Sequence, residues 1–171
     1  MGPEVLALIC GLAAAASFGT GDFCGGFATK RSSVYSVIVI SQIFGFALLV
    51  GLAVALGESI PSGTNLVFGG LAGFFGTLGL MALYIGLARG RMGVVAPVSA
   101  IVGTVLPIII GIFLEGAPSG GQFLGLVLAV FAIWYLAGGG SAASFRPREL
   151  GLPILAGVGF GFFFVFIDQV S

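Results

Sequence analysis

Six apolar stretches follow one another along the chain, and the charged and turn-forming residues fall between them. The stretches cover residues 5–28, 34–56, 65–88, 93–114, 121–137 and 150–170. Each is close to the roughly 20 residues that a helix needs to cross about 30 Å of hydrocarbon. The pattern therefore predicts an all-α integral membrane protein, a polytopic bundle of about six transmembrane helices.

Small residues recur four positions apart within these stretches. Glycine is common in membrane helices because it lets two backbones approach closely, and a spacing of four puts the small residues on one helix face. The pattern predicts close helix crossings at the sets Gly11/Ala15/Gly19, Ala47/Gly51/Ala55, Gly69/Gly73, Gly103/Pro107/Gly111, Gly121/Gly125/Ala129 and Gly157/Gly161.

The composition narrows the class of protein and of chemistry. Charged residues make up 7% of the chain, against about 25% in an average soluble domain. The net charge of +0 gives no reason to expect a nucleic-acid partner. The absence of histidine removes imidazole acid–base chemistry and most zinc sites. We therefore expect no metal, no cofactor and no catalytic residue, and we expect Cys10 and Cys24 to be small apolar fillers.

The basic residues are confined to alternate connections. All of them follow the first, third or fifth stretch: Lys30, Arg31, Arg89, Arg91, Arg146 and Arg148. The amino terminus and the other connections carry only the acids Glu4, Glu58 and Glu115. The positive-inside rule then places the odd-numbered connections in the cytoplasm, in a multi-pass protein of the cell membrane. Aromatic residues near the basic ends predict an interfacial belt made of Tyr35, Tyr84, Trp134 and Tyr135.

The longest connection, residues 138–149, is rich in Gly and Ser and then basic. We expect it to link a five-helix repeat, residues 1–137, to the first helix of a second repeat, residues 150–171. One helix cannot form a bundle. We therefore expect a truncated chain whose partner is either a missing second repeat or, in a homodimer, a second copy.

Several segments, taken in order, resemble the EamA domain of the drug/metabolite transporter superfamily. They are SFGTGDFCGG at 17–26 with Ser41 and Gln42, GLARG at 86–90, VVAPVSA at 94–100, Glu115, and PSGGQFLG at 118–125. The resemblance covers nearly the whole chain and implies two five-helix repeats, ten helices in all. Two features depart from the family. Gly116 follows Glu115 where members usually have Arg, and the charges place the amino terminus outside, whereas members are usually drawn with it in the cytoplasm.

The resemblance implies a secondary-active exporter or carrier of small metabolites that works by alternating access between inverted repeats. Its partners would be the lipid bilayer and a small-molecule solute. The alternative is a structural or assembly membrane subunit without its own transport path. A polar, water-accessible cavity would separate the two, because a transporter needs one and a scaffold does not.

An enzyme is a third possibility, since residues 19–22 spell the Gly-x-Gly-Asp motif of intramembrane aspartyl proteases. That chemistry needs two carboxylates close enough to share a proton. The other intramembrane acid, Asp168, is expected near the opposite membrane face. At about 1.5 Å of rise per residue it lies on the order of 20 Å away from Asp22. We therefore expect no enzyme.

Asp22 is the leading candidate for substrate binding, because it is the only acid well inside an apolar stretch. An ionisable group there is costly and marks a functional site by default. It could bind a cationic group or a coupling proton. Its alternative is an interfacial position beside Lys30 and Arg31.

The other candidates are polar residues or helix breakers within the stretches. Ser17, Thr20, Gln42, Tyr84 and Ser99 could contact a solute, or could form hydrogen bonds between helices. Pro97 and Pro107 are expected to break the fourth helix, and of these Pro107 is the more informative, because Pro is well tolerated near a helix start. The phenylalanines of residues 160–166 are expected to face lipid.

Overall fold

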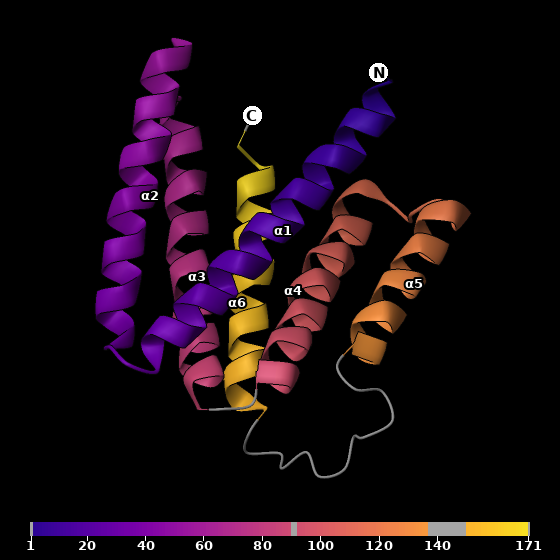
Figure 1. The fold of residues 1–171 in the computed structure, drawn as a ribbon. Helices are drawn as coiled ribbons and strands as arrows, with labels where there is room; N and C mark the ends of the chain where they lie inside the picture. Colours follow the sequence, from indigo (N-terminus) through magenta and orange to yellow (C-terminus); the bar gives the residue numbers. More distant parts are fainter. Residues whose placement is uncertain (1, 90–91, 137–149, 171) are drawn as a thin grey trace.

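The computed structural model describes residues 2–89, 92–136 and 150–170, and only the backbone of residues 3, 4, 92, 115 and 136. The predicted linker at 138–149, with Arg146 and Arg148, lies outside the described residues, as does Arg91. The described part is helical throughout (Figure 1). Its elements are α1 (Pro3–Thr29), α2 (Val34–Leu56), α3 (Gly63–Ala88), α4 (Met92–Glu115), α5 (Gly120–Leu136) and α6 (Gly151–Asp168).

The predicted membrane helices are confirmed, and five of them are long and apolar enough to cross a bilayer. α5 is the exception, because its 17 residues reach only about 25 Å at 1.5 Å per residue. The helices alternate in direction. The α1–α2 connection, the end of α3 and the start of α4 therefore lie at one end of the molecule, and the amino-terminal end of α1 and the α2–α3 and α4–α5 connections lie at the other (Figure 1).

Local hydrogen bonds and backbone geometry explain where α2 ends and where α5 begins. α2 ends at Gly57, whose φ of 71° is left-handed and suits glycine, and the N–H of Glu58 donates to the carbonyl of Ala53 at 2.9 Å. At the start of α5, Gln122 accepts from the backbone N–H of Ser119 at 2.8 Å, while the Ser119 hydroxyl accepts from the Gln122 N–H at 3.4 Å. This reciprocal pair is a capping box.

The predicted break in α4 does not occur. The helix runs from Met92 to Glu115 without interruption and contains both Pro97 and Pro107. Pro97 lies in the second turn and removes only the bond to the carbonyl of Gly93. Pro107 removes only the bond to the carbonyl of Gly103, and the helix continues on both sides of it.

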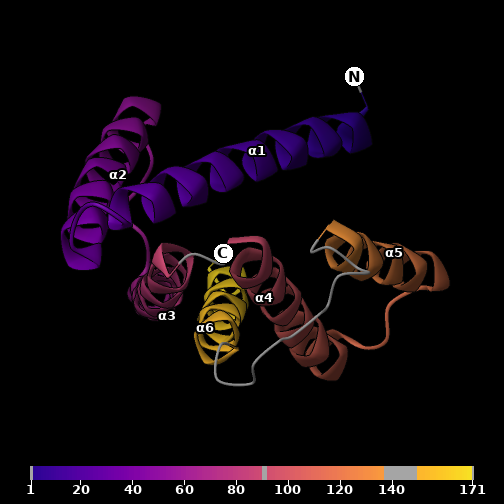
Figure 2. The ribbon, with the colours of Figure 1, turned by 60° about the horizontal axis from the view of Figure 1, so that its bottom comes forward.

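α6 lies at the centre of the molecule, between α3 and α4 (Figure 2). Glycines make this position possible. A Cβ added to Gly159 would come within 2.7 Å of the Cα of Gly79 on α3, and one added to Gly157 within 2.7 Å of the carbonyl oxygen of Ser99 on α4. The close crossing predicted for Gly157 and Gly161 is therefore present. No heavy atom lies within 4 Å of a Cβ built at Gly11, Gly69, Gly73, Gly121 or Gly125.

The aromatic residues of α6 correct one expectation. Phe162 and Phe166 pack against Phe75 of α3 with ring centroids 5.0 and 5.5 Å apart, and Phe166 also stacks on Phe68 at 6.4 Å. Most of this run faces α3 and not lipid, because the narrow glycine face of α6 brings α3 close. Phe164 is the clearly exposed member, at 49%.

The side chains of α1, α2 and α5 are much less buried by neighbouring helices than those of α3, α4 and α6. α5 contacts only α4 among the described elements, and α1 contacts α3 and α2 through its carboxyl-terminal part while its first half extends away (Figure 2). Leu12 and Phe18 are 64% and 67% exposed. In a membrane such apolar surface is covered by lipid or by further helices.

Candidate functional site

Asp22 lies on the face of α1 that packs against α3. Gly25 and Gly26, three and four residues further along the helix, are buried on that face. A Cβ at Gly26 would come within 2.7 Å of Leu87, and one at Gly25 would overlap the ring and hydroxyl of Tyr84. The two glycines therefore let α1 approach α3 closely, and Asp22 sits one turn before this contact.

The surroundings of Asp22 separate the two interpretations of its role. Its side chain is half-buried, and it forms no ion pair with Lys30 or Arg31 within the part of the chain that the structure describes. Arg31 instead lies over the ring of Phe27, 5.3 Å from its centroid. The acid is therefore not neutralised by the basic end of its own helix, which favours a position inside the protein over one in the interface.

Tyr84 is the α3 residue that meets α1 at Gly25, one turn beyond Asp22. Its side chain is 5% exposed, and its ring and hydroxyl lie against the backbone of Gly25. The predicted belt position is therefore wrong for Tyr84, whereas Tyr35 and Tyr135 are 66% and 70% exposed. Sequence reasoning placed Tyr84 near a membrane interface because Arg89 follows five residues later, but it could not show which face of α3 is covered by α1.

Gln42 and Thr77 connect α2 to the same side of α3. The Gln42 amide donates to the Thr77 hydroxyl at 3.5 Å, and Thr77 donates to the carbonyl of Gly73 at 2.8 Å. Thr77 is seven residues before Tyr84, so the two lie on one face of α3, about 10 Å apart along the axis. A polar strip thus lies where α1 and α2 meet α3, and its members are Asp22, Tyr84, Gln42 and Thr77.

Ser17 and Thr20 do not join this strip. At about 100° per residue they lie about 140° and 160° around α1 from Asp22. Both are exposed, and the Thr20 hydroxyl donates to the carbonyl of Ala16 at 2.7 Å within its own helix. Their proximity to Asp22 in the sequence does not bring them to the same face.

Ser99 lies on the other side of the bundle, at the crossing of α4 and α6. It is 3% exposed, and its hydroxyl donates to the carbonyl of Ala96 at 2.9 Å. With its hydrogen-bonding capacity used inside its own helix, Ser99 is well suited to a crossing where Gly157 approaches its backbone.

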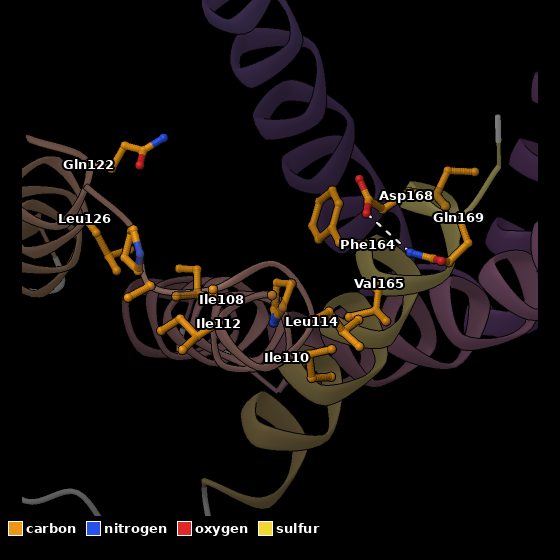
Figure 3. A pocket seen from close by; sticks show the side chains of 16 residues that line it. Ile108, Ile110, Ile112, Leu114, Gln122, Leu126, Phe164, Val165, Asp168 and Gln169 are labelled. Carbon is orange, nitrogen blue, oxygen red and sulfur yellow. Dashed lines mark hydrogen bonds between the residues drawn. The ribbon is translucent and has the colours of Figure 1, made fainter.

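A cavity of about 770 Å³ lies between the second half of α4, the start of α5 and the end of α6 (Figure 3). This volume is within the range of small-molecule sites. Pro107, Ile108, Ile112 and Phe164 contribute to its apolar lining. Asp168 is the only charged residue among the described residues that line it.

Three polar side chains border this cavity: Gln122, Asp168 and Gln169. The Gln169 amide donates to one carboxylate oxygen of Asp168 at 3.4 Å (Figure 3). The Gln122 oxygen is held by Ser119, at 2.8 and 2.9 Å, so its NH₂ group is left for other partners. Sequence reasoning assigned none of the three to a binding site, because the chain separates Gln122 and Asp168 by 46 positions.

Comparison with known families gives one match. The sequence model of the EamA-like transporter family matches residues 5–138, which include nearly all of α1 and the whole of α2 to α5. No curated protein and no solved structure matches the chain. The matched region covers well over half of the sequence and has the apolar helices that a membrane transporter requires. The chain therefore belongs to the EamA-like transporter family.

Proposed function

We propose that this protein is a secondary-active exporter or carrier of small metabolites, and that Asp22 takes up positive charge during transport, either on the solute or as a coupling proton. One observation carries the proposal. Asp22 is a half-buried carboxylate without an ion pair among the described residues, one turn before the point where Gly25 of α1 meets Tyr84 of α3. A charged carboxylate inside a membrane protein is energetically costly, so we expect Asp22 to have a function in transport.

The packing of α1 supports a moving role for this contact. α1 meets α3 only through its carboxyl-terminal part, and Gly25 and Gly26 offer no side chains that would lock the two helices together. A tilt of α1 about this contact would change the access of Asp22 to either side of the membrane. Such a motion is what alternating access requires.

The wider organisation belongs to the same proposal. Residues 1–137 form one five-helix repeat, residues 138–149 form a linker, and residues 150–171 begin a second repeat. Further helices, from a second repeat or from a second copy of the chain, cover the exposed side of α1. The protein lies in the cell membrane with its basic connections in the cytoplasm. The exposed apolar residues of α1 and the alternation of Lys30, Arg31 and Arg89 with Glu58 support this arrangement.

The competing function is a structural or assembly subunit. A scaffold needs close helix contacts, and α3, α4 and α6 have them. It does not need a large cavity bordered by polar groups. The cavity at Asp168, with Gln122 and Gln169 on its border, is therefore the feature that favours transport.

Solute counterflow in proteoliposomes tests the proposal. The purified protein would be reconstituted, and the liposomes would be preloaded with mixtures of unlabelled metabolites that are cationic, zwitterionic or neutral. A transporter accelerates the entry of the matching labelled solute over that in protein-free liposomes. A well-folded protein that accelerates none of these classes would support the structural subunit instead.

A further inference from the structure

The face of α6 that lines the cavity carries a regular series of residues. Gly157, Gly161, Phe164 and Asp168 follow one another at intervals of four, three and four, so they lie on one side of the helix. Gly157 and Gly161 contact Val102 and Leu106 of α4. Phe164 and Asp168 continue the same face beyond this contact and line the cavity.

The same series occurs in α1. Gly11, Ala15, Phe18 and Asp22 have identical spacing, 146 positions earlier in the chain. In the same register Leu6 corresponds to Leu152, and the small residues Cys10 and Ala13 correspond to Ala156 and Gly159. Acids are rare in these helices, so the coincidence of Asp22 with Asp168 is the most informative element of the alignment.

The two acids occupy equivalent places at opposite ends of the molecule. α1 and α6 run in opposite directions, so the end of α1 lies with the basic connections and the end of α6 lies at the other end of the bundle (Figure 1). Each Asp is within about two turns of the carboxyl-terminal end of its helix. An inverted repeat places equivalent residues in this way, one toward each membrane face.

We propose that the cavity at the ends of α4, α5 and α6 binds a small organic cation with an apolar body, and that Asp168 holds its charge as the repeat counterpart of Asp22. This inference rests on the proposed function, in which Asp22 takes up positive charge. It adds a second recognition site on the opposite side of the membrane and defines the solute as a cation.

The chemistry of the lining defines the ligand class. Asp168 brings one negative charge, and no described residue of the lining brings a positive one, so an anion would find no counter-ion. Within the described residues one carboxylate oxygen of Asp168 receives the Gln169 amide and the other accepts no hydrogen bond. Ile108, Ile112 and the half-exposed ring of Phe164 suit an apolar body, and the ring face also attracts a cation.

A fluorescent reporter inside the cavity tests the proposal on the full chain in lipid nanodiscs. Trp134 is the single tryptophan and lies outside the lining. In a Trp134→Phe, Phe164→Trp background, emission reports on the cavity alone. The probes are phenyltrimethylammonium and tert-butylbenzene, which share a shape and differ in charge. We expect a saturable change with the cation, and a much weaker one with the neutral compound.

Variants then identify the charge. Asp168→Asn should raise the half-saturating concentration of the cation about tenfold or more, the loss expected when a charged partner is removed. Asp168→Glu should restore most of the affinity. Glu58→Gln, which removes one acid at the same end of the molecule but outside the lining, should change the concentration less than about twofold. If the size-exclusion profile of Asp168→Asn shows that this variant is misfolded, the cation affinities of Asp168→Glu and Glu58→Gln are compared instead.

Either of two results would contradict the proposed cation site. One is an equal fluorescence change with the cationic and the neutral probe. The other is the same half-saturating cation concentration for Asp168→Asn and Glu58→Gln. Asp22→Asn separates this proposal from the proposed function. If Asp22→Asn abolishes transport while Asp168→Asn leaves cavity binding unchanged, the cavity site is wrong and the role of Asp22 stands. If Asp168→Asn weakens binding while Asp22→Asn leaves transport unchanged, the cavity site stands and the role of Asp22 is wrong.

Discussion

The ring of Tyr84 on α3 lies against the backbone of Gly25 on α1, one helical turn beyond Asp22. The absence of a side chain at Gly25 is what allows the two helices to touch there. α1 touches α3 in the part that carries Asp22, while the first half of the helix remains uncovered by the described residues. Tyr84 is thus the buried packing residue of α3 at this end of α1.

Gly25→Ala should weaken this contact. The added methyl overlaps the Tyr84 ring, which is buried and cannot move aside without displacing its own neighbours. Overpacking of this kind costs about 1–3 kcal/mol. We expect a lower free energy of unfolding, measured by denaturant titration in detergent. Gly21→Ala is the matched control, because a Cβ there meets nothing within 4 Å and alanine favours the helix. Equal stabilities for the two variants would contradict the α1–α3 contact.

Gly159→Ala should be more damaging. The Cβ would lie 2.7 Å from both the Cα and the nitrogen of Gly79 and 2.9 Å from the carbonyl oxygen of Phe75. These are backbone atoms, so α6 must move away from α3, and we expect a loss of about 3 kcal/mol or failure to fold. Thermal unfolding followed by circular dichroism would measure the effect, with Gly125→Ala as the control since its surroundings are open. Unchanged melting for Gly159→Ala would contradict the close contact between α6 and α3.

The orientation can be tested at two exposed connections. Cys10 and Cys24 are both exposed and must first be replaced. In that background, Ser33→Cys in the α1–α2 connection should react with a membrane-impermeant maleimide only after the cells are permeabilised. Ser59→Cys in the α2–α3 connection should react in intact cells. The reverse pattern would place the basic connections outside.

The helix bounds could be predicted from the sequence to within about two residues, because charges and turn residues must leave the apolar region. The prediction for α2, 34–56, matches the structure at both ends. Glycine spacing was a weaker guide. It identified the crossing face at Gly157 and Gly161, but it gave equal weight to Gly69 and Gly73, where an added Cβ would meet no neighbouring helix within 4 Å. Spacing defines a helix face, whereas the partner of that face depends on how distant segments pack.

The candidate site shows the same limit. Asp22 could be selected from the sequence, because the cost of a buried charge depends on its own surroundings along the helix. Its neighbour Tyr84 could not be identified as such, since 62 positions separate them. For the same reason, the sequence could not show that Asp168 lines a cavity that Gln122 also borders. The expectation that residues 160–166 face lipid failed because α6 is enclosed by α3 and α4.

The central claim is that Asp22 takes up positive charge in the transport cycle, and the rate of transport by Asp22→Asn across a range of pH tests it most directly. The assay uses proteoliposomes and the solute identified by counterflow. We expect the transport rate of the wild type to depend on pH, because protonation removes the negative charge of the Asp22 carboxylate. Asp22→Asn cannot ionise, so its rate should fall about tenfold or more and lose that dependence, while Glu58→Gln should behave as the wild type. An Asp22→Asn protein with the wild-type rate and the wild-type pH profile would contradict the account.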